Sequence, residues 1–303
     1  MRDSFITELK KQAEHNEKII LITADLGFKI FDEFKQDLPK QFLNVGVAEQ
    51  NMTEVACGLA LEGYKVFTYS IGNFSTLRCL EQIRNDVCYH DLDITVVSSG
   101  AGFSYGQLGI SHFATEDLAI MSALPNMSVF VPADSWESTL ITKYLIKTKG
   151  PKYLRIDKSE GGSDQKKELK FEDGFRKIFN GSKIIIISIG GILEEAIKTR
   201  EILKKENYEI SIISVFKIKD LNEKKLVSII RNFDHIITLE EHTIVGGLFS
   251  KISQICINNK FMPKSIISFG IPDTFPKVVG SQSYLRTYYG IDSQALTHEI
   301  LKL

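Results

Sequence analysis

The segment Phe42-Leu43-Asn44-Val45-Gly46-Val47-Ala48-Glu49-Gln50-Asn51-Met52 joins a strand-like run to the start of a helix. Residues 42–45 form the strand-like run, and apolar side chains then recur at helical spacing from Met52 to Ala60. A strand that leads into a helix is the repeating unit of a parallel sheet covered by helices. The segment therefore predicts an α/β fold, and it places Glu49 just beyond the carboxyl end of a strand.

The same alternation continues along the chain in both directions. Short apolar runs predict five more strands in the first half, at residues 19–23, 65–69, 94–98, 128–131 and 153–156. Amphipathic stretches between most of these runs fit helices on the faces of a parallel sheet. Residues 1–160 are therefore predicted to form one doubly wound α/β domain.

Residues 161–174 are rich in charge and glycine and have no apolar period, which is typical of a linker. A second strand–helix series follows, with apolar runs at residues 183–188, 209–215, 235–239 and 265–267. Residues 175–303 are long enough for a domain of their own. The predicted architecture is two doubly wound α/β domains joined by a linker.

The composition narrows the class of function. Of 303 residues, 43% are hydrophobic and 25% charged, and the formal net charge is −1. A nearly neutral chain has no long-range field to gather nucleic acid or an acidic membrane surface, so we expect a small substrate. Its four cysteines include no C-x-x-C pair, which favours reduced, buried thiols in a cytoplasmic protein. With no apolar signal segment and no run long enough to span a membrane, we expect an untargeted protein.

A glycine-rich stretch, residues 100–106 (GAGFSYG), follows the strand-like run 94–98 and approximates a dinucleotide-binding fingerprint with one extra residue. Helical periodicity resumes only near Glu116, so we interpret residues 100–115 as a long loop over a site. His112 on this loop is either a proton-transfer group or a surface histidine without a role. No histidine or cysteine cluster has ligand spacing, so no metal site is expected within the chain.

Position alone leaves two uses for Glu49. Open α/β sheets bind their ligands at the carboxyl ends of the strands, which favours a functional role. A glutamate in the first turn of any helix also complements the helix dipole and needs no other function. The cluster Glu240-Glu241-His242 after the run 235–239 has a similar place, and we interpret it as charge pairing at a strand end or at a subunit contact.

Residues 44–52 followed by Gly58-Leu59-Ala60 resemble the pyrimidine-binding domain of transketolases. Further matches follow in the order and spacing of that family: Asn73-Phe74, residues 81–86 (EQIRND), Ser99-Gly100-Ala101-Gly102, Ser111-His112, Glu116-Asp117, residues 124–127 (LPNM), residues 131–134 (VPAD) and Tyr153-Leu154-Arg155. The second domain resembles the C-terminal domain of transketolases, through residues 240–247 and Gly270-Ile271-Pro272-Asp273. The resemblance covers essentially the whole chain.

The resemblance implies roles for five side chains around thiamine diphosphate. Glu49 matches the carboxylate that bonds a ring nitrogen of the aminopyrimidine, which lets the cofactor remove its own thiazolium proton. Phe74 matches the aromatic residue that stacks on that ring, and Ile71 stands where many members have a second one. His112 matches a histidine that contacts the sugar. Arg155 matches an arginine near the substrate's phosphate, although a strand-end ion pair would use the same residue.

The chain also departs from full-length transketolases. It has no upstream domain with the G-D-G…N motif that binds the diphosphate through a divalent metal, so the resemblance implies a partner subunit that supplies the diphosphate and Mg²⁺ ligands, in a heterotetramer with two copies of each chain. Gly100 stands in place of a phosphate-binding histidine, and Leu108 in place of an aspartate that contacts a substrate hydroxyl. We therefore expect the substrate-binding residues to have changed.

The implied function is the transfer of a two-carbon ketol unit from a ketose to an aldehyde acceptor. Two related enzymes share the use of the glutamate and remain alternatives: the beta subunit of a 2-oxo-acid dehydrogenase decarboxylase component, and a deoxyxylulose-phosphate synthase relative. A third alternative is a scaffold module that has kept the fold and lost the chemistry.

Overall fold

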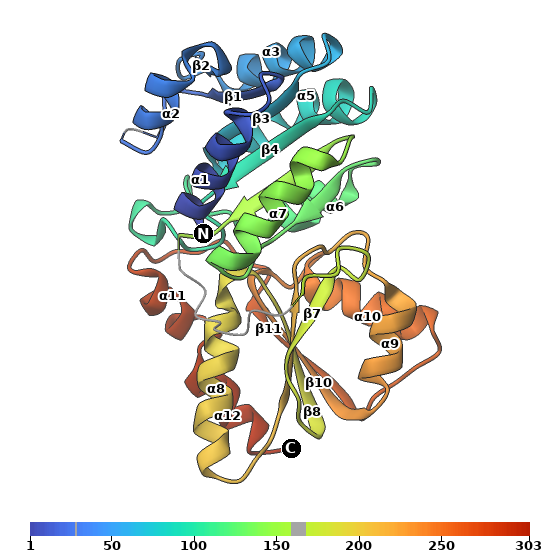
Figure 1. The fold of residues 1–303 in the computed structure, drawn as a ribbon. Helices are drawn as coiled ribbons and strands as arrows, with labels where there is room; N and C mark the ends of the chain where they lie inside the picture. The colour runs from blue at the N-terminus through green and yellow to red at the C-terminus, as the bar shows by residue number, and fades with distance from the viewer. Residues whose placement is uncertain (28, 159–167) are drawn as a thin grey trace.

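The computed structural model describes residues 1–27, 29–158 and 168–303 of the chain. The described residues form two sheets, one above the other in the view of Figure 1, each flanked by helices. The predicted α/β fold is confirmed. Half of the predicted linker, residues 161–167, lies outside the described residues.

The first sheet has six parallel strands in the order β2-β1-β3-β4-β6-β5. The strands are β1 (Ile19–Thr23), β2 (Phe42–Asn44), β3 (Lys65–Ile71), β4 (Ile94–Ser99), β5 (Ser128–Phe130) and β6 (Lys152–Ile156). The helices are α1 (Arg2–Ala13), α2 (Asp32–Asp37), α3 (Glu49–Leu61), α4 (Gly72–Ser75), α5 (Leu80–Gln82), α6 (Asp117–Ala123) and α7 (Ser135–Lys147). Because all six strands run the same way, the loops that follow them share one edge of the sheet.

The second sheet has five strands in the order β11-β10-β8-β9-β7. The strands are β7 (Phe175–Phe179), β8 (Lys183–Ile189), β9 (Ser211–Val215), β10 (Phe233–Thr243) and β11 (Ser265–Ile271). The helices are α8 (Leu193–Lys205), α9 (Glu223–Ile230), α10 (Leu248–Asn258), α11 (Gln282–Tyr288) and α12 (Ser293–Ile300). Short 3-10 turns η1, η2, η4 and η5 lie at Pro39–Gln41, Leu77–Cys79, Gly106–Leu108 and Gly190–Ile192, and a π-helical segment η3 at Ile83–Cys88.

The sequence prediction missed β7, the edge strand of the second sheet. It pairs antiparallel with β9, whereas every other pair in this sheet is parallel. Phe175 and Ile178 are buried while Lys177 is exposed. Arg176 is buried as well, and the pairing register shifts between Lys177 and Phe179, so these five residues lack the period-2 alternation that predicts a strand.

Apolar side chains hold the helices on both faces of the first sheet. Phe5 of α1 and Ile141 of α7 pack with Phe67 of β3 on one face. Met52 of α3 and Leu118 of α6 belong to a core on the other face, and this core continues into the second domain. The two domains therefore share buried apolar surface, the main stabilising contribution in folding.

Backbone pairing reinforces this shared core. Beyond β5, the Val131 amide donates to the Phe216 carbonyl, and the Ile218 amide donates to the Val129 carbonyl. The second domain is thus hydrogen-bonded to the edge strand of the first sheet.

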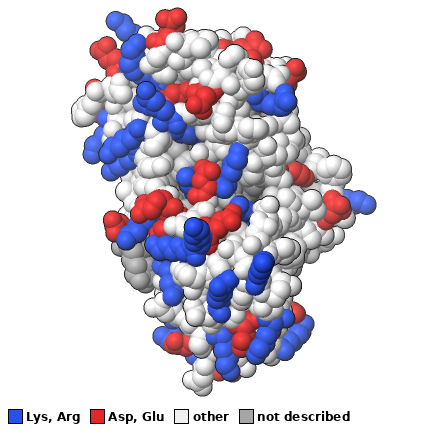
Figure 2. All heavy atoms as spheres, turned by 90° about the vertical axis from the view of Figure 1, so that its right-hand side faces the viewer, with Lys and Arg blue, Asp and Glu red and all other residues white. Residues whose placement is uncertain are grey.

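Acidic and basic side chains are interspersed on the face of the molecule drawn in Figure 2, with uncharged areas between them. Among the described residues, no helix combines the length and the apolar character needed to cross a membrane.

Candidate active site

Glu49 opens α3, directly after the loop that follows β2. Its side chain is only 2% exposed, whereas Val47, two residues earlier, is 75% exposed. No side chain caps the amino end of α3, so the first turn leaves backbone amide groups that favour a nearby carboxylate. A buried carboxylate needs a partner as well, because burial of a charge without one is costly.

Arg78 supplies that partner. Its Nη1 lies 2.6 Å from Oε2 of Glu49, and its guanidinium carbon lies 4.3 Å from the centre of the Phe74 ring. Arg78 belongs to the short turn η2, which follows β3 and α4. The guanidinium therefore links the predicted catalytic carboxylate to the predicted stacking ring.

His112 reaches the same place from the loop after β4. The centres of the His112 and Phe74 rings are 5.2 Å apart in an edge-to-face arrangement, and His112 Nδ1 lies 2.9 Å from the Ser111 hydroxyl. Burial lowers the pKa of His112 below its usual value, which favours the neutral imidazole at physiological pH. His112 thus contacts the Phe74 ring directly, and Arg78 links that ring to Glu49.

Ile71 is the last residue of β3, three residues before Phe74, and is buried. Leu108 lies in η4 on the glycine-rich loop, with its side chain exposed. Both residues lie in segments that lead to Phe74 or His112, but no polar contact assigns a role to either.

Gly100 follows β4 with a φ of +95°, a conformation that favours glycine. A β-carbon at this position would overlap the ring of Tyr105. The Lys158 ammonium lies 3.8 Å from the centre of the Tyr105 ring, and the His112 ring lies 6.2 Å from it. Tyr105 therefore fills the space beside Gly100 that a larger side chain would need.

Arg155 is fully buried in β6. Its Nε donates to Oδ2 of Asp117 at 2.8 Å, and its Nη2 donates to the backbone carbonyls of Ala114 and Glu241. Of the two uses considered for Arg155, the strand-end ion pair is present in the structure, and the substrate contact stays a prediction.

Lys158 is a cation that the sequence reasoning missed. It lies two residues beyond the end of β6, has an exposed side chain and stands over Tyr105. Partial burial lowers its pKa, and the nearby Arg2 lowers it further. Its position just past a strand end was a usable signal, because such positions face the ligand edge of a parallel sheet.

The cluster Glu240-Glu241-His242 ends β10 and joins the two domains. Glu241 pairs with Arg286 and accepts the backbone N–H of Phe103, so it fixes the glycine-rich loop of the first domain. The predicted charge pairing at a strand end is confirmed for Glu241. Burial raises the pKa of Glu241, and the charge of Arg286 opposes that shift.

Glu240 and His242 cap two helices. Glu240 accepts the backbone N–H groups of Leu248 and Phe249 at the start of α10, while Nε2 of His242 accepts that of Leu118 in the first turn of α6. Burial raises the pKa of Glu240 to about 7 and lowers that of His242 to about 4. Both side chains are committed to the fold.

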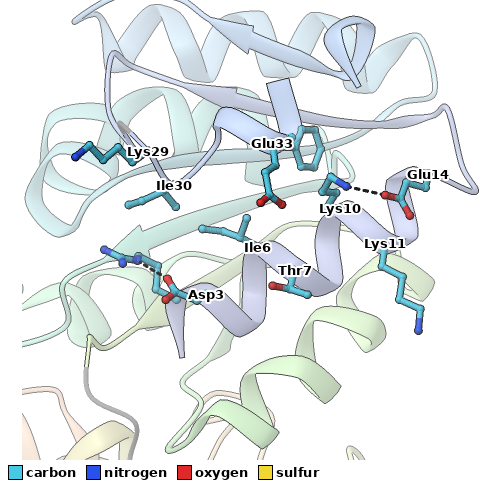
Figure 3. Close-up of a pocket in the computed structure, with 11 residues that line it drawn as sticks. Asp3, Ile6, Thr7, Lys10, Lys11, Glu14, Lys29, Ile30 and Glu33 are labelled. Carbon is cyan, nitrogen blue, oxygen red and sulfur yellow. Dashed lines mark hydrogen bonds and ion pairs between the residues drawn. The ribbon is translucent and has the colours of Figure 1, made fainter. Parts of the chain in front are cut away.

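A pocket of about 720 Å³ lies away from this group, between α1 and the segment that leads into α2 (Figure 3). Its lining mixes charges of both signs, with Lys10 and Glu14 paired at 2.8 Å. Glu49, Phe74 and His112 do not line it. Within residues 1–27, 29–158 and 168–303, no group of three or more His, Cys, Asp or Glu side chains is placed to hold a metal ion.

Comparison with known families accounts for this arrangement. Residues 1–163 match the transketolase pyrimidine-binding domain, and residues 176–296 match the transketolase C-terminal domain. The chain belongs to the transketolase family. This result confirms the predicted family and the predicted order of the two kinds of domain.

Transketolase relatives of similar length match nearly the whole chain. A Methanocaldococcus jannaschii protein named "Putative transketolase C-terminal section" is 34% identical over 100% of this chain and 95% of its own length. One subunit of the apulose-4-phosphate transketolase of Actinobacillus succinogenes is 28% identical over 89% of this chain and 87% of its own. A solved structure described as a split gene transketolase, an inactive beta4 tetramer, is 29% identical with a TM-score of 0.87, covering 99% of this chain and 96% of its own.

Transketolases depend on thiamine diphosphate, and the side chains at the Glu49 site fit its aminopyrimidine ring. A flat ring that carries hydrogen-bond donors is held well when it stacks on an aromatic side chain and a carboxylate nearby accepts its hydrogen bonds. The flat guanidinium of Arg78 already lies over the Phe74 ring while it donates a hydrogen bond to Glu49. These two side chains therefore hold a group of the required shape and polarity.

Proposed function

We propose that this chain is the pyrimidine-binding subunit of a two-component transketolase, which transfers a two-carbon ketol unit from a ketose to an aldehyde acceptor. The observation that carries the proposal is the buried Glu49 carboxylate, which Arg78 links to the Phe74 ring, with His112 in contact with the same ring. Four buried thiols suit a reducing compartment, so we place the enzyme in the cytoplasm.

Each of the three side chains has a separate task. Bound thiamine diphosphate supplies the nucleophilic carbon that a protein side chain cannot provide. Glu49 would hold a proton at the ring nitrogen that it faces, and burial keeps water from competing for that bond. Phe74 would fix the plane of the ring. His112, kept neutral by its lowered pKa, would accept a proton from a substrate oxygen or donate a hydrogen bond to one.

A partner subunit completes the site in this proposal. Four exposed apolar side chains lie in the loops that carry Glu49, Arg78 and His112: Val47, Leu77, Leu108 and Ile110. Exposed apolar side chains gathered around a site are typical of an interaction surface. The names of the relatives, which describe a section or a single subunit of a transketolase, support the same conclusion.

We assign the diphosphate and Mg²⁺ ligands to this partner, with two copies of each chain in the assembly. The matching solved structure, a beta4 tetramer described as inactive, supports a requirement for another chain.

Lys158 is our candidate for binding an anionic end of the substrate. Its ammonium stands over the Tyr105 ring, whose centre lies 6.2 Å from that of the His112 ring. Arg155 cannot take this role without leaving Asp117 uncompensated in the interior. An ammonium binds phosphate or another anion as a point charge, so this arrangement does not by itself require a sugar phosphate.

The test is reconstitution. The chain is co-expressed with an α/β partner that contains a G-D-G…N motif, thiamine diphosphate and Mg²⁺ are added, and two-carbon transfer is followed across panels of ketoses and aldoses. Glu49→Ala should abolish turnover, whereas Glu54→Gln, which changes an exposed glutamate of the same helix, should not. Normal turnover by Glu49→Ala would refute the proposed role of the carboxylate.

The same experiment separates the alternatives. Decarboxylation of a 2-oxo acid, without transfer from ketoses, would identify a dehydrogenase component or a synthase relative. Failure of every candidate partner to confer activity, with the fold intact, would favour a scaffold module.

A further inference from the structure

The guanidinium of Arg78 contacts both side chains that the proposed function assigns to the cofactor's aminopyrimidine. Both anchors expected for that ring are already in use, since Glu49 Oε2 lies 2.6 Å from Arg78 Nη1 and the guanidinium lies 4.3 Å from the centre of the Phe74 ring. A second planar group could not stack on the same face and bond to the same oxygen at the same time.

The chemistry of the two groups is alike. A guanidinium is planar, delocalised and rich in N–H donors, and it stacks on aromatic faces. An aminopyrimidine that carries a proton opposite a carboxylate presents the same features to the same two side chains. From this juxtaposition, and resting on the proposed function, we infer that Arg78 is a latch that fills the pyrimidine seat in the free subunit and must leave before the cofactor binds.

Burial explains why a latch is useful. The Glu49 side chain is 2% exposed, so without a cation it would be a buried, unpaired charge whenever the cofactor is absent. Arg78 removes that cost in the free chain. Its own side chain is 43% exposed, so it can turn into solvent without breaking the packing of the core.

The latch should reduce the apparent affinity for the ring. When a ligand binds only the open state, its apparent affinity is reduced in proportion to the fraction of the protein in that state. One charge-assisted hydrogen bond and one partly exposed cation–π contact favour the closed state modestly, by about tenfold. Removing the guanidinium should therefore strengthen binding of the pyrimidine by about tenfold.

Thiamine without its diphosphate is the probe, because it tests the pyrimidine seat without the partner. It is titrated into the full-length isolated chain and followed by ligand-observed NMR. Arg78→Ala should bind thiamine about tenfold more tightly than the wild type. Arg231→Ala is the matched control, since Arg231 lies 6.0 Å above the ring of Phe261 in the second domain and bonds to a carbonyl; its binding should equal that of the wild type. Weaker, equal or undetectable binding by Arg78→Ala would overturn the latch.

A second measurement tests the contact itself. Unfolding by urea is compared for the wild type, Arg78→Ala, Glu49→Ala and the double variant, and the latch predicts a favourable coupling between the two side chains. Strict additivity would show that the contact is absent in solution. These results are distinguishable from failure of the proposed function, which would appear as normal two-carbon transfer by Glu49→Ala in the reconstituted enzyme.

Discussion

Substitution of Gly100 by alanine tests why the glycine-rich loop lacks the histidine found in full-length transketolases. Gly100 has a φ of +95°, and a β-carbon there would overlap the Tyr105 ring. The left-handed conformation costs a residue with a β-carbon about 1–2 kcal/mol. Overpacking against Tyr105 adds about 1–3 kcal/mol. We therefore expect Gly100→Ala to lower the free energy of unfolding by about 2–5 kcal/mol.

Gly63→Ala isolates the backbone part of this cost. Gly63 has a φ of +83°, and nothing lies within 4 Å of a β-carbon built on it. The assay is urea denaturation followed by circular dichroism, with the midpoint and slope fitted for each variant. Gly63→Ala should lose only about 1–2 kcal/mol. In a Tyr105→Ala background, Gly100→Ala should fall to a similar cost.

Equal costs for Gly100→Ala and Gly63→Ala would refute the reasoning, because they would show that the Tyr105 ring moves away freely. The same result would make Gly100→His a feasible way to restore a phosphate contact. If the ring instead keeps its place, Gly100→His destabilises the loop at least as much as alanine does. In that case the Tyr105 ring explains why glycine, and not histidine, stands at position 100.

Three further outcomes are expected. Arg155→Met leaves the buried Asp117 carboxylate without its ion-pair partner and should lower the free energy of unfolding, measured by urea denaturation, by about 3–5 kcal/mol. Lys264→Met breaks an exposed ion pair and should lower it by less than about 1 kcal/mol. Equal losses for the two variants would contradict the burial argument. Because burial raises the pKa of Glu240 from 4.5 to about 7, the folded chain binds more protons than the unfolded chain between these values, and stability falls as the pH rises through 7. Glu240→Gln should flatten that fall in a pH series of urea titrations, and an unchanged slope would exclude Glu240 as its source. All four thiols are buried, and burial raises the pKa of Cys57 to about 12, so the native chain should react with a thiol reagent at pH 8 only after denaturant is added; rapid labelling of the native chain would contradict this.

The fold could be predicted because strand and helix periods alternate clearly along most of the chain. Strands such as β1 and β8 are continuous apolar runs, typical of strands covered on both faces. The edge strand β7 was missed because its five residues show no regular alternation of buried and exposed side chains, and its antiparallel pairing with β9 contains a register shift. Local pattern carries little information about such an edge.

The site was predicted only in part. The Glu49 position followed from a strand–helix junction, and the roles of Phe74 and His112 came from ordered family matches. Arg78 escaped because its contact with Glu49 joins residues 29 positions apart, which no local spacing reveals.

Arg155 was expected to bind the substrate because it matches an arginine near the substrate's phosphate in transketolases and its planar fork suits an anion. Its burial depends on the direction in which the side chain leaves the strand, which the sequence pattern does not show. In β6 the Arg155 side chain turns inward to Asp117, while Lys158 beyond the strand end remains exposed. The sequence contained both cations but could not rank them.

The central claim is that Glu49 activates the cofactor, and proton exchange at the cofactor's thiazolium carbon tests it most directly. The exchange rate with deuterium is measured by quenched-flow NMR in the assembled two-component enzyme, for the wild type, Glu49→Gln and the exposed control Glu54→Gln. A positioned acid–base group contributes about 10²–10⁴-fold to such a step. We predict that Glu49→Gln slows exchange by at least about a hundredfold while Glu54→Gln matches the wild type; wild-type exchange in Glu49→Gln would contradict the account.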